Sequence, residues 1–257
     1  MSYETITWDA ADGVGRLTMN RPERRNGITG VMMNELYEAV QIAAADDSLK
    51  VVVFTGAGRS FCVGADLEHY SSGADDPGSG LDTFGITRLL HEMPAVTLAA
   101  VNGAAAGAGF GWACACDLRF ATASAVFNTA FLDVAVAGDM AGPWTLPRLV
   151  GAAKARELYF LPGKFGADEA KRIGLVTDVF ADDTFGDDVE AVVARLAAAA
   201  PLAIRGMKAN FLDGETMGLG TYIDVESERH SRIAASADTA EAFRAFLDKR
   251  TPTFEGR

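Results

Sequence analysis

The first part of the chain alternates strand-like and helix-like patterns of apolar residues. Apolar and polar residues alternate over residues 4–8 and 15–19, which predicts a β-hairpin turned at Asp12-Gly13. A helical pattern capped by Thr29 extends to about residue 45, and the apolar run at 49–55 predicts a buried strand. This order of elements is typical of an α/β fold.

The longest apolar stretch, residues 93–117, predicts a buried strand, a glycine-rich turn and a helix of small residues. Asn102-Gly103 breaks the strand, and Gly107, Gly109 and Gly111 allow close approach of the backbone at the helix start. Free N–H groups at such a start can stabilise negative charge on an oxygen. The glycines and Asn102 argue against a transmembrane helix.

A second glycine turn, residues 61–67, precedes another predicted helix, and residues 71–80 are predicted to form a loop. Residues 81–91 are predicted to form a helix, which Pro94 prevents from continuing. Further strands are expected at 118–121, 125–127 and 176–180, and further helices at 152–160, 167–172 and 188–199.

The last part of the sequence is predicted to be wholly helical. Pro201 begins a helix, and Asp238-Thr239-Ala240-Glu241 resembles a capping box. An apolar stripe follows at Phe243, Phe246 and Leu247. We therefore divide the chain into a βα core over residues 1–200 and a C-terminal helical region over 201–257.

The composition excludes several classes of protein. A net charge of −12 over 257 residues argues against a nucleic-acid partner. Three cysteines (Cys62, Cys114 and Cys116) are too few for a disulfide framework and are interpreted as buried thiols. The N-terminus lacks the pattern of a signal peptide, so we expect a cytoplasmic protein without a membrane partner.

Motif spacing leaves few candidates for chemistry. The glycines fail the spacing of a dinucleotide-binding turn, no Walker or G-x-S-x-G motif occurs, and the three histidines lack metal-ligand spacing. Three arginines at positions 21, 24 and 25 form either a solvated loop or a phosphate contact. Asp139 stands among apolar residues and is either a turn or helix cap or a base with a raised pKa.

Six segments together carry a family resemblance: Asn20-Arg21-Pro22, Phe61-Cys62-Val63-Gly64-Ala65-Asp66-Leu67, Pro94-Ala95-Val96, Val101-Asn102-Gly103-Ala104-Ala105-Ala106-Gly107-Ala108-Gly109, Cys116-Asp117 and Leu146-Pro147-Arg148. From about Tyr3 to Arg257 the chain resembles the crotonase, or enoyl-CoA hydratase/isomerase, superfamily. The resemblance implies an α/β fold with a ββα spiral core, a C-terminal helical trimerisation region, and a homotrimer or dimer of trimers.

The same resemblance implies an acyl-CoA thioester substrate, with coenzyme A as part of the substrate and no separate cofactor or metal. The N–H groups of Ala65 and Ala108 would hold the thioester oxygen. Arg24 and Lys249, the latter from a neighbouring subunit, would lie near the CoA phosphates. The remaining residues that we assign to substrate binding are Cys62, Val63, Gly64, Asp66, Leu67, Gly107, Phe131 and Trp144.

Departures from the family pattern bear on the reaction. Hydratases of this family carry two glutamates, and Gly111 and Phe131 stand at those positions here. Asp139 stands where several other members place a catalytic aspartate, and the chain resembles in particular the ring-1,2-epoxyphenylacetyl-CoA isomerase-like members. We therefore expect an isomerase in which Asp139 is the acid/base. The alternatives are a hydratase in which Asp139 activates water, a non-catalytic acyl-CoA-binding protein, and a dehalogenase in which Asp139 is the nucleophile. The dehalogenase is disfavoured, because no histidine stands near residues 81–82, where that enzyme needs its base.

Overall fold

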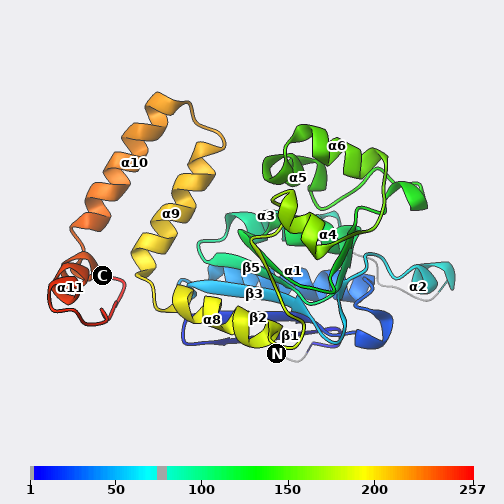
Figure 1. Ribbon diagram of the computed structural model, residues 1–257, viewed down its shortest axis with the longest axis horizontal. Helices are drawn as coiled ribbons and strands as arrows, with labels where there is room; N and C mark the ends of the chain where they lie inside the picture. Colours follow the sequence, from blue (N-terminus) through cyan, green and yellow to red (C-terminus); the bar gives the residue numbers. More distant parts are fainter. Residues whose placement is uncertain (1–2, 74–79) are drawn as a thin grey trace.

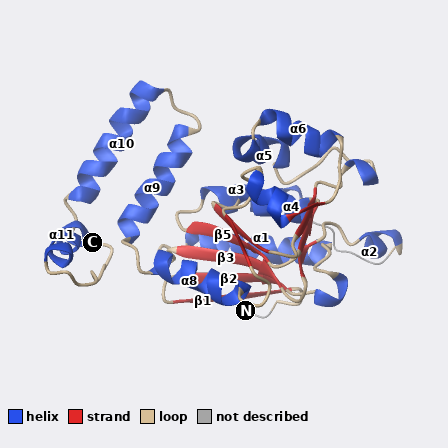
Figure 2. Ribbon diagram, viewed as in Figure 1, coloured by secondary structure: helices blue, strands red, loops and turns tan. Residues whose placement is uncertain are grey.

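The computed structural model describes residues 3–73 and 80–257, and within them the strands form two sheets (Figures 1 and 2). The larger sheet has the order β1-β2-β3-β5-β7-β10. Its strands are β1 (Ile6–Ala11), β2 (Val14–Met19), β3 (Val51–Gly56), β5 (Val96–Val101), β7 (Leu118–Thr122) and β10 (Asp178–Phe180). The β1–β2 pair is the antiparallel hairpin expected from the sequence, and the other neighbours are parallel.

The smaller sheet has the order β4-β6-β8-β9. It contains β4 (Ser60–Cys62), β6 (Ala104–Ala106), β8 (Val126–Asn128) and β9 (Phe165–Gly166). Three times the chain leaves a strand of the larger sheet and enters one of the smaller sheet. This alternation confirms the α/β class and the expected ββα spiral. Two of the short strands, β4 and β6, were predicted as parts of glycine turns, because three residues are too few to show a β pattern.

Helices cover both faces of the larger sheet (Figure 1). On one face, α8 (Phe185–Ala197) packs Val189 and Val193 against Val51, Val53 and Leu98. On the other face lie α1 (Gly30–Ala45), α3 (Gly85–Glu92) and α4 (Ala108–Ala115). The Thr29 hydroxyl caps α1 by accepting a hydrogen bond from Met32 N, as its position in the sequence suggested.

Helix α4 is the central element of the core, and all of its residues are buried. The last carbonyls of a helix need partners outside it. Arg119, buried in β7, supplies them: its guanidinium donates to Ala113 O and Cys116 O and also to Leu175 O at 2.7 Å. A buried cation at the C-terminus of a helix also complements the helix dipole.

The remaining helices of the core are α2 (Leu67–Ser71), α5 (Gly142–Val150), α6 (Ala152–Phe160) and α7 (Ala167–Arg172). Helix α5 was not predicted, since Pro147 lies inside it and obscures the helical pattern. The helix expected at 81–91 is divided into a 3₁₀ turn (Leu81–Phe84) and α3. Of the predicted loop at 71–80, residues 74–79 lie outside the described part of the chain.

The C-terminal region is helical, as predicted, and projects from the core (Figure 1). It contains α9 (Pro201–Gly214), α10 (Leu219–Ala234) and α11 (Ala237–Leu247). Lys208 of α9 is buried and pairs with Asp117, whose carboxylate also accepts hydrogen bonds from Thr97 N at 2.7 Å and Thr97 Oγ1 at 3.1 Å. These contacts attach α9 to β5 and to the end of α4. The division at residue 200 stays a prediction.

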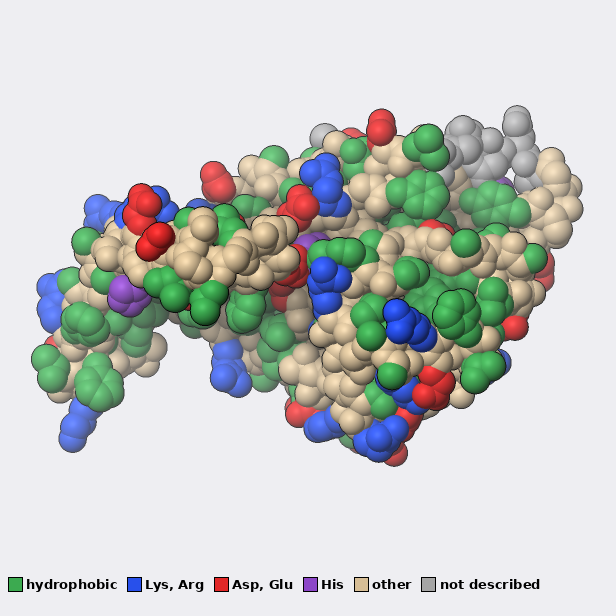
Figure 3. Space-filling model, turned by 90° about the horizontal axis from the view of Figure 1, so that it is seen from above, with side chains coloured by type: hydrophobic (Ala, Val, Ile, Leu, Met, Phe, Trp, Pro, Cys, Tyr) green, Lys and Arg blue, Asp and Glu red, His purple; other side chains and the backbone are tan. Residues whose placement is uncertain are grey.

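Helix α11 differs from the sequence prediction in its N-terminal cap, and its apolar stripe faces solvent. The predicted capping box is wrong: Ser236 caps α11, and Asp238 instead accepts hydrogen bonds from Glu255 N and Gly256 N at 2.7 and 2.9 Å. The stripe of Phe243, Phe246 and Leu247 is exposed. On the face shown in Figure 3, hydrophobic side chains gather both on the projecting C-terminal region (residues 201–257) and over the core. Across the described ranges, no helix combines the length and apolar character required to cross a bilayer.

Candidate active site

The two glycine turns predicted from the sequence lie against each other. Gly64 and Gly107 both have left-handed backbones, with φ of +85° and +53°. A Cβ added to Gly64 would lie 3.6 Å from Gly107 Cα, and one added to Gly107 would lie 3.5 Å from Gly64 Cα. Both turns therefore favour glycine for their backbone conformation, and the two distances show that the turns are in van der Waals contact. The structure places Ala65 and Ala108, the next residues of each turn, on one site.

The local pairing of their segments does not use the N–H groups of Ala65 and Ala108. Ile28 forms a parallel bridge with Ala65, through hydrogen bonds from Ile28 N to Gly64 O and from Asp66 N to Ile28 O, both 2.9 Å. In such a bridge the N–H of Ala65 itself faces away from Ile28. Ala108 is the first residue of α4, so its N–H has no partner within the helix. Both residues line one cavity of about 440 Å³.

This cavity is mostly apolar, and Asp139 is the only carboxylate among the described residues that line it. Among its other members, the structure brings together the predicted residues Val63, Gly64, Leu67, Gly107 and Phe131. Sequence reasoning missed six further members, which carry no local motif: Ile28, Met33, Tyr70, Ala130, Val134 and Val136. Ile28 could have been found only through its pairing with Ala65, which is a contact between distant segments.

Asp139 lies in a turn with an unusual backbone. Gly138, Met140 and Ala141 around it have φ of +99°, +48° and +52°. Ala141, not Asp139, is the N-cap of α5, and Asp139 Oδ1 is buried without a hydrogen-bond partner among the described residues. The helix-cap interpretation of Asp139 is therefore wrong. Burial raises the pKa of Asp139 above its ordinary value, as the apolar sequence around it suggested.

Neither Gly111 nor Phe131, at the two positions where hydratases of the family carry glutamates, provides a carboxylate. Phe131 is buried, lines the cavity and stacks on Tyr159 with ring centroids 5.9 Å apart. At Gly111, an added Cβ would lie 2.8 Å from Met140 Cβ, closer than real Cβ contacts. The space beside Gly111 is thus filled by the turn that carries Asp139.

Asp66, which we predicted to bind substrate, does not line the cavity. Its carboxylate caps α2 by accepting a hydrogen bond from His69 N at 3.1 Å and pairs with Arg21 at 3.0 Å. Burial acts to raise the pKa of Asp66, but the His69 N–H and the Arg21 guanidinium outweigh it and lower the pKa. Its position indicates that Asp66 fixes the turn that carries Ala65.

Trp144 and Cys62 also lie outside the cavity lining. Trp144 is 40% exposed, beneath Arg148 and beside His91, and lines a separate cavity of about 230 Å³. Cys62 is fully buried behind the glycine turns, and burial raises the pKa of its thiol to about 12, although the N–H groups of Gly64 and Gly109 act to lower it. All three cysteines are free and buried, as expected.

The two cations assigned to the CoA phosphates lie far apart in the chain. Arg24 is exposed and pairs with Glu68 at the start of α2, next to the cavity residue Leu67. Lys249 follows α11 with a φ of +55°. A contact of either side chain with CoA stays a prediction, as does the delivery of Lys249 from another subunit.

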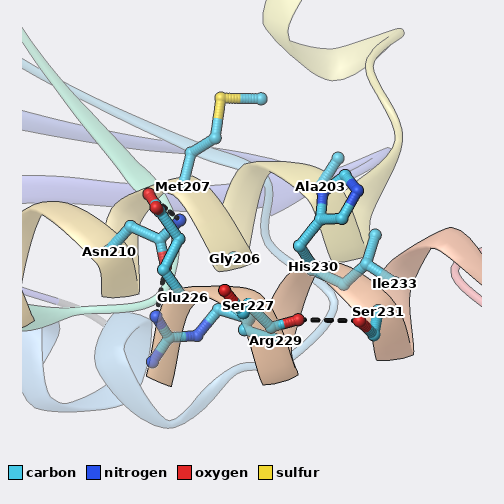
Figure 4. Close-up of a pocket in the computed structure, with 10 residues that line it drawn as sticks. All are labelled: Ala203, Gly206, Met207, Asn210, Glu226, Ser227, Arg229, His230, Ser231 and Ile233. Atoms are coloured by element: carbon cyan, nitrogen blue, oxygen red, sulfur yellow. Dashed lines mark hydrogen bonds between the residues drawn. The ribbon is translucent and has the colours of Figure 1, made fainter. Parts of the chain in front are cut away.

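A second cavity, of about 560 Å³, lies between α9 and α10 (Figure 4). The charged side chains Arg229 and Glu226 of its lining already have partners: Arg229 donates to Asn210 Oδ1 and pairs with Asp213 at 2.6 Å, and Glu226 accepts from Tyr222 at 2.7 Å. It lacks the glycine turns and the unpartnered acid of the other cavity. In the described ranges, no cluster of His, Cys, Asp and Glu could hold a metal ion. The cavity with Asp139 is therefore the candidate active site.

Comparison with known proteins agrees with this architecture. The family model described as enoyl-CoA hydratase/isomerase matches residues 9–257. The chain is 36% identical to a "probable enoyl-CoA hydratase" of Rhodobacter capsulatus over 100% of both chains. It is 35% identical to the "1,2-epoxyphenylacetyl-CoA isomerase" of Escherichia coli over 99% of both. The crystal structure of a "putative enoyl-CoA hydratase/isomerase" from Mycobacterium abscessus has a TM-score of 0.90 at 34% identity, covering 98% of this chain and 100% of that one. The chain therefore belongs to the enoyl-CoA hydratase/isomerase family.

Proposed function

We propose that this enzyme isomerises an acyl-CoA thioester, with Asp139 as the only acid/base. The observation that carries the proposal is the position of Asp139: it is the sole carboxylate among the described residues that line the cavity, and Ala65 and Ala108 line the same cavity. The substrate supplies its own CoA, so the proposed reaction needs no further cofactor.

In the proposed reaction, the Ala65 and Ala108 N–H groups hold the thioester oxygen. Asp139 removes a proton from a carbon made acidic by the thioester, and the electron pair moves onto that oxygen to form an enolate. Each N–H donor stabilises this charge by about 3 kcal/mol in the transition state. Asp139 then returns the proton at another carbon, which shifts a double bond, or the rearrangement opens an aryl epoxide. Substrate and product have the same mass.

The raised pKa of Asp139 suits both halves of this cycle. Burial makes the carboxylate a stronger base, and the acid that forms is then stable enough to wait for proton return. No hydrogen bond from the described residues competes for Oδ1. Phe131 and Met140 present apolar surface beside it, which favours a substrate carbon over a polar group at that place.

A panel of CoA esters tests the proposal. Linear 3-enoyl, 2-enoyl and phenylacetyl-derived esters are incubated with the enzyme, and products are analysed by mass and absorbance. We expect a product of unchanged mass from at least one ester. Asp139→Asn should abolish turnover, while Asp133→Asn, on an exposed residue of the preceding 3₁₀ turn (Leu132–Val134), should leave it intact. Isomerase turnover retained in a folded Asp139→Asn protein would refute the role of Asp139.

Hydration is the second candidate, favoured by the name of the Rhodobacter capsulatus relative. In that reaction Asp139 would activate water, and the product of crotonyl-CoA would gain the mass of one water. Binding of CoA esters without any change in mass across the panel would instead indicate a non-catalytic acyl-CoA-binding protein.

The exposed stripe on α11 supports a homotrimer or a dimer of trimers as the working assembly. Phe243, Phe246 and Leu247 are 68%, 83% and 78% exposed in one chain, which is costly in water unless another surface covers them. Light scattering on the eluting protein measures the mass directly. A monomer at micromolar concentration would contradict the proposed assembly and the delivery of Lys249 from a neighbour.

A further inference from the structure

The turn that carries Asp139 rests directly on the bare backbone of Gly111 in α4. A Cβ added to Gly111 would lie 2.8 Å from Met140 Cβ, 3.3 Å from Met140 O and 3.6 Å from Asp139 O. The first of these distances is shorter than the closest contacts that Cβ atoms make. Only glycine at position 111 therefore leaves room for this turn.

Met140 holds a backbone conformation that its own side chain disfavours. Its φ is +48°, the following Ala141 has a φ of +52°, and non-glycine residues avoid this region. Such strain persists only where the surrounding structure enforces it. Met140 is 4% exposed and lines the cavity together with Asp139, so its packing opposes relaxation of the turn.

We propose that Met140, seated on Gly111, is a positioning and specificity-determining residue for the isomerisation proposed above, on which this inference rests. The Met140–Gly111 contact fixes where the Asp139 carboxylate enters the cavity. The apolar Met140 side chain also fills the wall above α4, so that no water is held opposite Asp139. The proton that Asp139 takes from one carbon then returns to another carbon, with no water consumed.

A double-mutant cycle tests the positioning role. Gly111→Ala pushes against Met140 Cβ and shifts the turn, and a shift of about 1 Å at a reacting group can lower the rate by about 100-fold. We expect this loss in kcat, with KM for the ester changed by less than about threefold, because the glycine turns that hold the thioester are unaltered. Gly163→Ala is the matched control, since a Cβ there meets no atom within 4 Å.

Met140→Gly removes the atom that collides in Gly111→Ala, and glycine accepts a φ of +48°. The double variant should therefore recover at least about tenfold in kcat over Gly111→Ala alone, which is a coupling of the kind seen between contacting residues. Effects that simply add, or an unchanged kcat in Gly111→Ala, would overturn the positioning role.

Product analysis tests the specificity role and does not depend on Gly111→Ala folding. Met140→Gly opens the wall, so we expect part of the product to gain the mass of water, whereas Met140→Leu, which keeps an apolar side chain, should give only isomer. A purely isomeric product from Met140→Gly would overturn the specificity role. If the unmodified enzyme isomerises no ester in the panel, the proposed function itself fails. If it isomerises one and the variants behave additively, only the present inference fails.

Discussion

Gly109→Ala should separate the two turns of the proposed oxyanion site with little loss of fold stability. A Cβ at position 109 would lie 2.6 Å from both Cys62 Cβ and Cys62 O and 2.8 Å from Cys62 Sγ. Optimal contacts between carbons are about 3.5–4.0 Å, so the neighbours must move by roughly 1 Å. One of them is a backbone carbonyl, which cannot rotate away. The shift therefore displaces the chain between Cys62 and Ala65 relative to α4.

The magnitude follows from two opposing terms for stability and one for activity. Overpacking costs about 1–3 kcal/mol, while alanine stabilises a helix by about 1 kcal/mol relative to glycine. We therefore expect unfolding in urea to change by at most about 2 kcal/mol. A misplacement of about 1 Å between Ala65 and Ala108 should lower kcat/KM by about 100-fold, equal to about 2.7 kcal/mol.

The assay compares Gly109→Ala with Gly163→Ala, since each adds one methyl group. Steady-state kinetics on the ester identified by the panel gives kcat/KM, and urea titration gives the free energy of unfolding. Gly163→Ala should match the unmodified enzyme in both. If Gly109→Ala keeps the same kcat/KM as Gly163→Ala, the paired turns do not form the site that holds the thioester oxygen.

Three further predictions concern buried polar groups. Burial raises the folded-state pKa of Asp139, so the folded state loses stability as pH rises through that pKa. Asp139→Asn should therefore be more stable than the unmodified protein at pH 7. In urea titrations, the difference in unfolding free energy should vanish below pH about 3.9, the ordinary pKa of aspartate. Lys208→Met should lower the unfolding free energy by about 3 kcal/mol, because Asp117 loses its buried partner, whereas exposed Lys164→Met should have little effect. Tyr159→Phe removes a buried hydroxyl without a partner in the described structure and should leave thermal stability unchanged or raise it by about 1 kcal/mol.

The sequence was most informative where local pattern and tertiary role agree. The helix at Ala108–Ala115 is an apolar run buried throughout, and the strand at Val51–Gly56 is apolar and buried apart from the half-buried Thr55. Gly64 and Gly107 could be recognised as turns because only glycine tolerates their backbones. That the two turns touch could not be read from either segment, since it depends on the spiral that brings residues about forty positions apart together.

The sequence was least informative where a residue serves a distant partner. Asp66 was assigned to substrate because it lies in the predicted motif, but it caps α2 and pairs with Arg21. Trp144 was assigned to the pocket because the family resemblance includes it. Helix α5 begins at Gly142, after the left-handed pair at Met140 and Ala141, and Trp144 on this helix lines the separate cavity of about 230 Å³. A change of backbone direction within three residues leaves no signature in hydrophobic periodicity.

Asp139, Met140 and Ala141 each carry a cost in stability, and we infer that this cost serves the chemistry of the site. Met140 and Ala141 each occupy a conformation that costs on the order of 1–3 kcal/mol, and half-buried Asp139 has one buried carboxylate oxygen, Oδ1, without a partner among the described residues. Nothing in the packing of α4 requires this, because a turn without strain and a larger residue than Gly111 would fill the same space. Selection for stability alone would remove all three features. Their presence together, at the only carboxylate among the described cavity residues, is expected if the turn is retained to hold one base at one place.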